Sequence, residues 1–285
     1  MALRERRASG HESLSLATAL LQRARLASPD AGLWEAADLQ WWSRMPRRSD
    51  ALEQLFWLDG DGPVAAVLLT DWGRAWGCDP ILVPRAVGVS LGEVWERALE
   101  AISSLDLDAV EVLARDDDFE LSRLLESAGF AAGERSGMAW MDAADRPEVP
   151  ALPAGFGLVD RRTAGGPHPM RLRNGEQVAA RLRRCSLYDP ALDLAVVAPE
   201  GEIAGYSLYW LDPVTKVGLL EPMRTEDAFQ RRGLARAMLA EGLERLAERG
   251  ARRLKVGYAT DAARTLYLGA GFRAAATCTL HERRP

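Results

Sequence analysis

A repeated segment constrains the fold of this chain more than any other sequence feature. Residues 124–130 read Leu-Leu-Glu-Ser-Ala-Gly-Phe, and residues 266–272 read Leu-Tyr-Leu-Gly-Ala-Gly-Phe. The spacing of leucine, glycine and phenylalanine is the same in both, which indicates an internal duplication. We therefore expect two halves of similar architecture. One pair of matches leaves a chance similarity of two short segments as the alternative.

A proline-rich stretch separates these halves. Residues 145–153 read Asp-Arg-Pro-Glu-Val-Pro-Ala-Leu-Pro, and such a stretch is extended and poor in hydrogen-bond donors. We place the domain boundary there, with a first domain over 1–147 and a second over 148–285.

Hydrophobic periodicity predicts a mixed α/β (α+β) fold, in the order βαβββαβαβ for the C-terminal half. Its strands are expected at 156–161, 192–197, 203–211, 216–225, 254–258 and 272–280, and its helices at 174–185, 232–249 and 261–268. The N-terminal half has less definition. Its helices are expected at 12–26, 33–43, 91–103 and 119–127, and its strands at 55–58, 64–70 and 109–113.

Composition excludes several classes of function. The formal net charge of −5 gives no reason to expect nucleic acid or an anionic membrane as partner. The chain has three cysteines and three histidines, with no disulfide framework and no spacing typical of a metal site. No apolar run is long enough to cross a bilayer, and no signal peptide is recognisable. We expect a cytoplasmic protein without a metal.

The segment Gln230–Ala235, Gln-Arg-Arg-Gly-Leu-Ala, carries the strongest chemical indication. It follows a predicted strand and begins a long helix, whose first turn offers unpaired N–H groups and the positive end of the helix dipole. Gly233 lets a phosphate approach the backbone, and Arg231, Arg232 and Arg236 add positive charge. The alternative is an ordinary basic helix start that contains a glycine.

The pattern Gln-x-x-Gly-x-Ala between a strand and a helix resembles the acetyl-CoA motif of the GNAT superfamily of N-acyltransferases. Residues 263–267, Ala-Arg-Thr-Leu-Tyr, with Gly271-Phe272 resemble the second motif of that family. The similarity is close over the final third of the chain and rests on element order elsewhere. It implies two tandem GNAT-like domains, each a mostly antiparallel, splayed sheet flanked by helices, with acetyl-CoA as co-substrate.

The resemblance also implies roles for individual residues. Tyr267 matches the tyrosine that protonates the departing CoA thiolate. Thr260 stands where the family often has asparagine, and it can instead cap the following helix. The remaining CoA contacts would come from the backbone of Met223 and Thr225 and from Arg231, Arg232, Gly233, Leu234, Ala235 and Arg236.

Glu221 is the candidate general base. Strict alternation places it on one face of its strand with Met223 and Thr225. A carboxylate in an otherwise apolar run can take a proton from an amine nucleophile, or it can form an ion pair at the end of the strand. The candidates for substrate contact are Tyr188, Asp189 and Tyr206. Asp189 can bind a cationic amine or begin a turn.

The N-terminal half lacks this chemistry. No Gln-x-x-Gly pattern precedes its helix at 91–103, and Leu125 stands where the other half has Tyr267. We interpret it as a degenerate copy, and whether it lines the substrate cleft stays open. Only one strand follows Phe272, so the closing hairpin is truncated, or the sister half or another chain completes the sheet.

The prediction is acetyl transfer from acetyl-CoA to a primary amine of a small molecule or peptide, by direct attack in a ternary complex. The alternative is a non-catalytic CoA-binding or sensor protein, which the threonine at position 260 and the missing strand leave open. The sequence fixes neither the acceptor, the acyl chain length nor the oligomeric state.

Overall fold

The computed structural model describes residues 3–105 and 109–284, which form two compact units. Unit 1 takes the described residues of Met1–Leu39, Pro46–Ser136 and Ala276–Pro285. Unit 2 takes Gln40–Met45 and Gly137–Ala275. Each is a mostly antiparallel sheet flanked by helices, as predicted. In the part of the chain that is described, no helix is long and apolar enough to cross a membrane.

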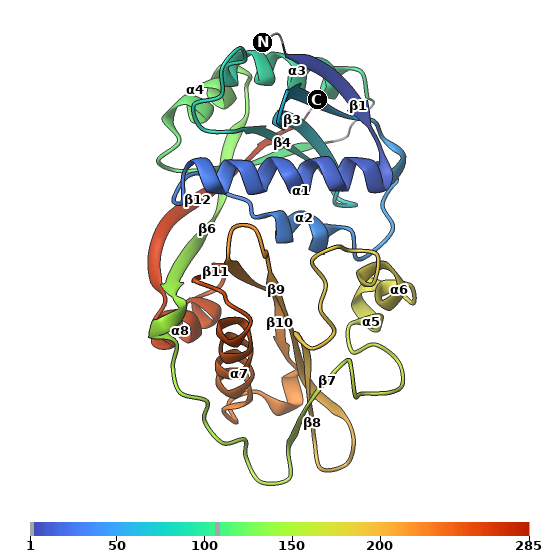
Figure 1. Ribbon diagram of the computed structural model, residues 1–285, viewed down its shortest axis with the longest axis vertical. Helices are drawn as coiled ribbons and strands as arrows, with labels where there is room; N and C mark the ends of the chain where they lie inside the picture. Colours follow the sequence, from blue (N-terminus) through green and yellow to red (C-terminus); the bar gives the residue numbers. More distant parts are fainter. Residues whose placement is uncertain (1–2, 106–108, 285) are drawn as a thin grey trace. The chain divides into compact units, whose positions relative to one another are not determined.

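The sheet of unit 1 has the strand order β1-β2-β3-β4-β5-β12-β6. Helix α1 lies across β3 (Figure 1). The strands are β1 (Arg4–Ala8), β2 (Gln54–Asp59), β3 (Gly62–Asp71), β4 (Trp76–Leu82), β5 (Val110–Arg115), the later residues of β12 (Arg273–Arg283) and the first residues of β6 (Ala131–Asp142). The helices are α1 (Gly10–Ala27), α3 (Leu91–Ser103), α4 (Phe119–Ser127), the start of α2 (Ala36–Trp42) and the 3₁₀ turn η1 (Arg48–Ala51).

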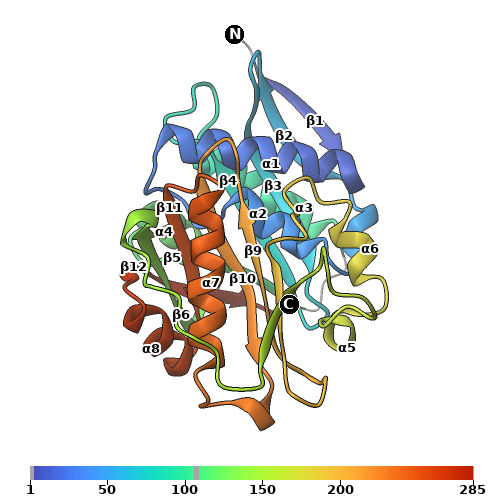
Figure 2. The same ribbon diagram turned by 60° about the horizontal axis from the view of Figure 1, so that its bottom comes forward.

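The sheet of unit 2 has the strand order β6-β11-β10-β9-β8-β7, in which only β10 and β11 pair in parallel. Helix α7 packs along β9 and β10 (Figure 2). The strands are β7 (Gly157–Asp160), β8 (Asp193–Val197), β9 (Ile203–Leu211), β10 (Val217–Thr225), β11 (Arg253–Tyr258) and the last residues of β6. The helices are α5 (Arg171–Asn174), α6 (Val178–Leu182), α7 (Leu234–Glu248) and α8 (Asp261–Gly269), with 3₁₀ turns η2 (Ala143–Asp145) and η3 (Asp227–Phe229).

Strand β6 supplies the strand that the C-terminal half lacks. Its residues 137–142 pair antiparallel with β11, so the sister half completes this sheet. In return, residues 278–283 of β12 pair antiparallel with β5 of unit 1. The two halves of the sequence on either side of the proline-rich stretch therefore exchange strands, and each compact unit contains one strand from the other half. We retain the division at 147/148 as a proposal about the duplicated halves.

Several predicted elements differ from the observed ones for local backbone reasons. The helix predicted at 174–185 is instead the two short helices α5 and α6, because Gly175 ends the first with φ = 84°. Helix α7 begins at Leu234 rather than 232, since Arg231 and Gly233 both adopt positive φ. Strands β1, β4 and β6 were not predicted.

Helix α7 is held against β9 by a glycine that faces a tyrosine. The ring of Tyr209 is fully buried, and its hydroxyl donates a hydrogen bond to the carbonyl oxygen of Met238 at 2.7 Å. A Cβ atom on Gly242 would lie 2.0 Å from this ring. The close approach of helix and strand therefore requires glycine at position 242.

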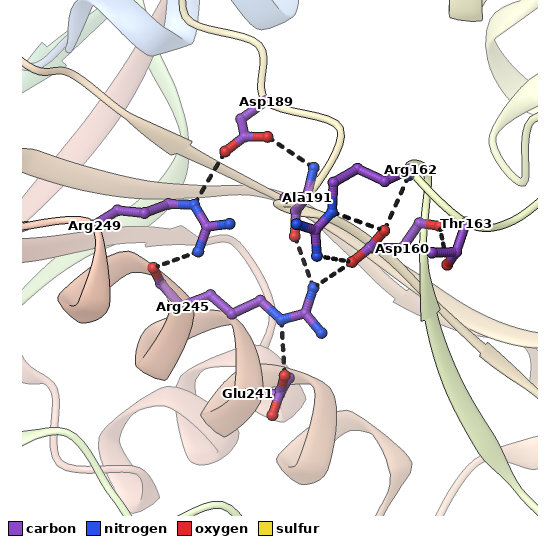
Figure 3. A network of polar contacts seen from close by, with 8 residues as sticks. All are labelled: Asp160, Arg162, Thr163, Asp189, Ala191, Glu241, Arg245 and Arg249. Carbon is purple, nitrogen blue, oxygen red and sulfur yellow. Dashed lines mark hydrogen bonds and ion pairs between the residues drawn. The ribbon is translucent and has the colours of Figure 1, made fainter.

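Polar contacts hold the C-terminal end of α7 in place (Figure 3). Arg245 donates to Oδ2 of Asp160 and to the carbonyl oxygen of Ala191, both at 2.8 Å. Arg162 also donates to Asp160, at 2.8 Å. Burial raises the pKa of this carboxyl, but the hydrogen bonds from Arg162 and Arg245 outweigh that effect and lower the pKa to about 2. Asp160 thus joins β7 to α7 as an ionised group.

Replacing Gly242 with alanine should destabilise the protein by about 1–3 kcal/mol, because the methyl group overpacks a rigid core. Gly269→Ala is the matched control, since a Cβ there meets no atom within 4 Å. In exposed helix positions, glycine to alanine ordinarily stabilises by up to about 1 kcal/mol. Urea unfolding of both variants measures the difference, and equal behaviour would contradict the packing argument.

Asp160→Asn should lower the free energy of unfolding at pH 7 on the order of 1–2 kcal/mol. The folded pKa lies below the unfolded value, so this contribution is present above about pH 4 and is lost as pH falls toward 2. The variant and the parent should therefore converge in stability on acidification. Asp145→Asn, at a carboxylate whose side chain is 57% exposed, is the control and should change little.

Candidate active site

Two parallel strands separate at the centre of unit 2. Strand β10 pairs with β11 from Val217 to Leu220, opposite Arg253 to Val256. From Glu221 to Thr225, β10 keeps β9 as a neighbour but has no partner on β11 among the described residues. This edge of β10 therefore leaves backbone groups available to a ligand, where the family resemblance places the pantetheine arm.

A bulge coincides with the point of separation. Relative to β9, β10 carries one extra residue between Leu220 and Met223. Leu220, Met223 and Thr225 lie opposite alternate residues of β9, so these three share one face. The predicted alternation through Glu221 is therefore wrong, because the extra residue interrupts it. The indole Nε1 of Trp210 donates to the backbone oxygen of Glu221 at 2.8 Å and fixes the bulge.

The first turn of α7 has no side-chain cap. Its N-cap residue is Gly233, in the left-handed conformation with φ = 82°, and Ala237 N–H donates to the Gly233 carbonyl at 3.1 Å. The amides of Leu234, Ala235 and Arg236 precede the first intrahelical bond, so they point outward as donors at the positive end of the helix dipole. This geometry suits phosphate oxygens.

The arginines expected around this turn are exposed. Arg232 lies over the Phe229 ring at 5.5 Å and donates to the carbonyl oxygen of Ala228 at 3.2 Å. Gln230 donates from Nε2 to Asp227 at 3.0 Å, which ties the loop to η3. Arg231 and Arg236 lie on either side of the helix start in the sequence, so the turn combines unpaired amides with three cationic side chains.

Glu221 and Tyr267 come together from different elements. Tyr267 is buried on α8, and its ring meets that of Phe272 edge to face at 6.2 Å between centroids. Burial raises the pKa of the Tyr267 hydroxyl, and the negative charge of Glu221 raises it further. The phenol therefore stays protonated at neutral pH beside a carboxylate, which is the arrangement that an acid and a base require.

Glu226, the neighbouring carboxylate, is committed to ion pairs. Arg173 donates to it at 2.8 Å and Arg224 at 3.2 Å. The hydrogen bond from Arg173 lowers the pKa of Glu226 most, so this group is a weak proton acceptor. Glu221 stays the proposed base.

Thr260 caps α8, as its sequence position predicted. Its side-chain oxygen accepts a hydrogen bond from the Ala263 N–H at 3.2 Å. The residue is exposed at the start of the helix that carries Tyr267. A contact between Thr260 and CoA stays a prediction.

The three predicted substrate residues lie in different surroundings. Tyr206 is buried beside Arg173, whose pKa is raised by Glu226 first and also by Tyr206. Asp189 accepts from the Ala191 N–H at 2.8 Å, which forms a turn, and from Arg249 Nε at 3.0 Å. Arg249 follows the 15-residue helix α7, about 22 Å from its first turn. The structure thus places Asp189 at the opposite end of α7 from its first turn.

Tyr188 belongs to a buried network that the sequence did not reveal. Its hydroxyl donates to Oδ2 of Asp193 at 2.8 Å, and Nε2 of His168 lies 2.8 Å from the same oxygen. Burial first, and then the Asp193 carboxylate, raise the pKa of Tyr188. His168 lies 25 residues before Asp193, so the fold brings it to the local pair of Tyr188 and Asp193.

In unit 1, the helix that corresponds to α7 is α3, and side chains cap its first turn. The side chain of Ser90 accepts from the Glu93 N–H at 3.2 Å, and the Glu93 carboxylate accepts from the Ser90 N–H at 2.7 Å. This capping box satisfies two donors and places a negative charge at the N-terminus of α3. An anion is therefore disfavoured there, and the Ser-x-x-Glu pattern at 90–93 is a sequence signal for it.

The comparisons with known proteins agree with this geometry. Residues 167–272 match the acetyltransferase (GNAT) family. A comparison with curated proteins finds no match. A tandem GNAT protein from the clavulanic acid biosynthesis pathway is 16% identical with a TM-score of 0.70, over 99% of this chain and 98% of that one.

Two further solved structures cover most of both chains. A GCN5-related N-acetyltransferase from Sphaerobacter thermophilus is 18% identical with a TM-score of 0.63, over 99% of this chain and 96% of that one. Another from Kribbella flavida is 20% identical with a TM-score of 0.56, over 92% and 95%. The chain therefore has the tandem GNAT fold, and its residues 167–272 match the model of the acetyltransferase (GNAT) family.

Proposed function

We propose that this protein is an N-acetyltransferase that transfers an acetyl group from acetyl-CoA to a primary amine of a small molecule or peptide. The observation that carries the proposal is the uncapped first turn of α7 beside the unpaired edge of β10. In this proposal, the amides and arginines of residues 231–236 hold the pyrophosphate. The backbone of Met223 and Thr225 pairs with the pantetheine arm.

The reaction proceeds by direct attack within a ternary complex. Glu221 accepts the proton that the amine loses, directly or through water, as the new C–N bond forms. The C–S bond breaks, and Tyr267 donates its proton to the departing thiolate. The raised pKa of Tyr267 keeps that proton in place until the thiolate develops. No cysteine is needed, since all three are buried.

A primary amine is the proposed acceptor because Glu221, a carboxylate that can take its proton, directly follows the buried apolar part of β10. Tyr206 on the neighbouring strand β9 is the candidate for contact with the substrate. Asp189 is not part of this site, given its ion pair at the far end of α7. We further propose a cytoplasmic location, which three free cysteines and the absence of a disulfide among the described residues favour.

A non-catalytic CoA-binding protein is the second candidate, and one measurement separates the two. Release of free CoA thiol is followed with acetyl-CoA and a panel of amines: polyamines, amino acids, aminoglycosides and peptides with a free N-terminus. Turnover with any of them supports the enzyme. Binding of CoA without turnover on all of them supports the sensor.

Glu221→Gln and Tyr267→Phe should each lower kcat by about 10²–10⁴-fold, the usual range for loss of a general base or acid. Neither change removes a contact to the pyrophosphate, so the Kd of CoA should stay within about twofold of the parent. Glu202→Gln is the control, at an exposed glutamate in the turn before β9. Full activity in both catalytic variants would refute the assigned roles.

Charge reversal at the helix start tests the phosphate site separately. Arg236→Glu places a carboxylate beside the free amides of α7 and should weaken CoA about tenfold, which corresponds to about 1.4 kcal/mol. Arg252→Glu reverses an exposed arginine that lies outside this turn. Calorimetric titration with CoA compares the two variants. An equal loss in both would assign the effect to overall charge and not to the site.

A further inference from the structure

Unit 1 contains a cavity of about 550 Å³ that the proposed reaction does not use. It is enclosed by α1, the loop that follows it, β4, β5 and the start of α4. This volume falls within the range of pockets that hold small organic ligands, roughly 300–1,000 Å³. Every lining residue belongs to unit 1, so the cavity is a property of this unit alone.

The cavity occupies the space between two separating strands. Strands β4 and β5 pair in parallel only at Trp76–Val110 and Gly77–Glu111. Beyond these pairs, residues 79–82 of β4 and 113–115 of β5 line the cavity on opposite sides. Unit 1 thus keeps the separation of parallel strands that forms the candidate active site in unit 2, but lines it with different side chains.

The charges of the cavity are unsuited to a phosphate ligand. Its two arginines are already paired, Arg25 with the buried Glu35 and Arg115 with Asp117 at 2.6 Å. The start of α4 is capped by Asp118, which accepts from the Leu121 N–H at 3.1 Å. Together with the capping box on α3, this leaves neither helix start open to an anion.

Asp79 gives the cavity its chemical character. This side chain is 6% exposed and lines the cavity. The indole Nε1 of Trp34 donates to its Oδ1 at 2.8 Å, and no cation in the described part of the chain forms an ion pair with it. Burial raises the pKa of Asp79 to about 7, the hydrogen bond from Trp34 opposes this, and the charge of Asp38 adds to it. A buried carboxylate without a counter-ion is costly, and a bound cation relieves that cost.

Apolar side chains line much of the rest of the cavity, and an aromatic ring lies at the surface. Leu21, Ile81, Leu113 and Leu121 line the interior. Phe119 also lines the cavity although it is 70% exposed, which is unusual for a phenylalanine. An exposed ring beside an acidic cavity can cover a cationic or apolar group of a ligand.

We propose that this cavity binds a small organic ammonium ion with an apolar body, that Asp79 is its counter-ion, and that Phe119 covers the bound ligand. The site is separate from the acyl-transfer site, and the proposal does not depend on the proposed function. Its specificity comes from one buried carboxylate in an apolar enclosure, so a neutral molecule of the same shape binds more weakly.

Calorimetric titration of the full chain with 2-phenylethylammonium and n-hexylammonium ions tests the proposal, with 2-phenylethanol and hexan-1-ol as neutral counterparts. We expect the ammonium ions to bind at least tenfold more tightly than the alcohols. Asp79→Asn should remove this preference, while Asp61→Asn, at an exposed aspartate in the turn after β2, should keep it. Equal affinity for ions and alcohols, or an unchanged preference in Asp79→Asn, would overturn the proposal.

Two further variants keep the result unambiguous. Phe119→Ala alters an exposed side chain, so it should fold even where Asp79→Asn does not, and it should weaken ammonium binding about threefold or more. Glu221→Gln should leave ammonium binding unchanged. A loss of ammonium affinity in this variant would show that the ion binds at the acyl-transfer site, and it would refute the unit 1 site. Binding of two CoA molecules per chain, with one lost in Asp79→Asn, would also refute it.

Discussion

The candidate site depends on the end of the parallel pairing between β10 and β11. Four residue pairs hold these strands together up to Leu220, and the extra residue of the bulge then redirects β10 while β9 continues beside it. Pro222 lies within this bulge and has no N–H to offer a neighbouring strand. The open edge, the position of Glu221 and the approach to the first turn of α7 all follow from this one interruption.

The two units differ in one local feature that decides whether a helix start can bind an anion: the presence of a side-chain cap. Both have parallel strands that diverge and a helix that follows. In unit 2 the helix begins at a left-handed glycine without a side-chain cap, whereas in unit 1 the serine and glutamate of the capping box occupy the same donors. A cap stabilises its helix by roughly 1 kcal/mol, so α7 forgoes stability at the place where a ligand can supply the missing acceptors.

The sequence was sufficient for the elements whose patterns are local. Helices α1, α3, α4 and α8 lie close to their predicted bounds because apolar periodicity and caps such as Ser90, Asp118 and Thr260 mark them. Strand β1 reads Arg-Glu-Arg-Arg-Ala and has no apolar alternation, and β4 contains Gly77 and Pro80, so neither was recognisable. The bulge in β10 depends on its pairing with β9, which alternation along one strand does not contain.

The predicted site residues differ in how far their surroundings follow from the local sequence. Tyr267 was assigned from a motif of a known family and Glu221 from its place in an apolar strand, and the structure couples the two electrostatically. Asp189 was judged from its local sequence, yet its environment is set by Arg249, 60 residues further along the chain. His168 likewise reaches the pair of Tyr188 and Asp193 from 25 residues away in the sequence.

The exchange of strands has a consequence for the order in which the chain can fold during synthesis. Strand β5 of unit 1 needs residues 278–283 as its partner, and a ribosome makes these only after all of unit 2. Unit 2 meets no such delay, because residues 137–142 are made before their partner strand β11. Until the last strand emerges, one edge of β5 is an unpaired strand edge, the kind of surface on which chains aggregate. Unit 2 can thus finish folding before unit 1, most of which is translated first.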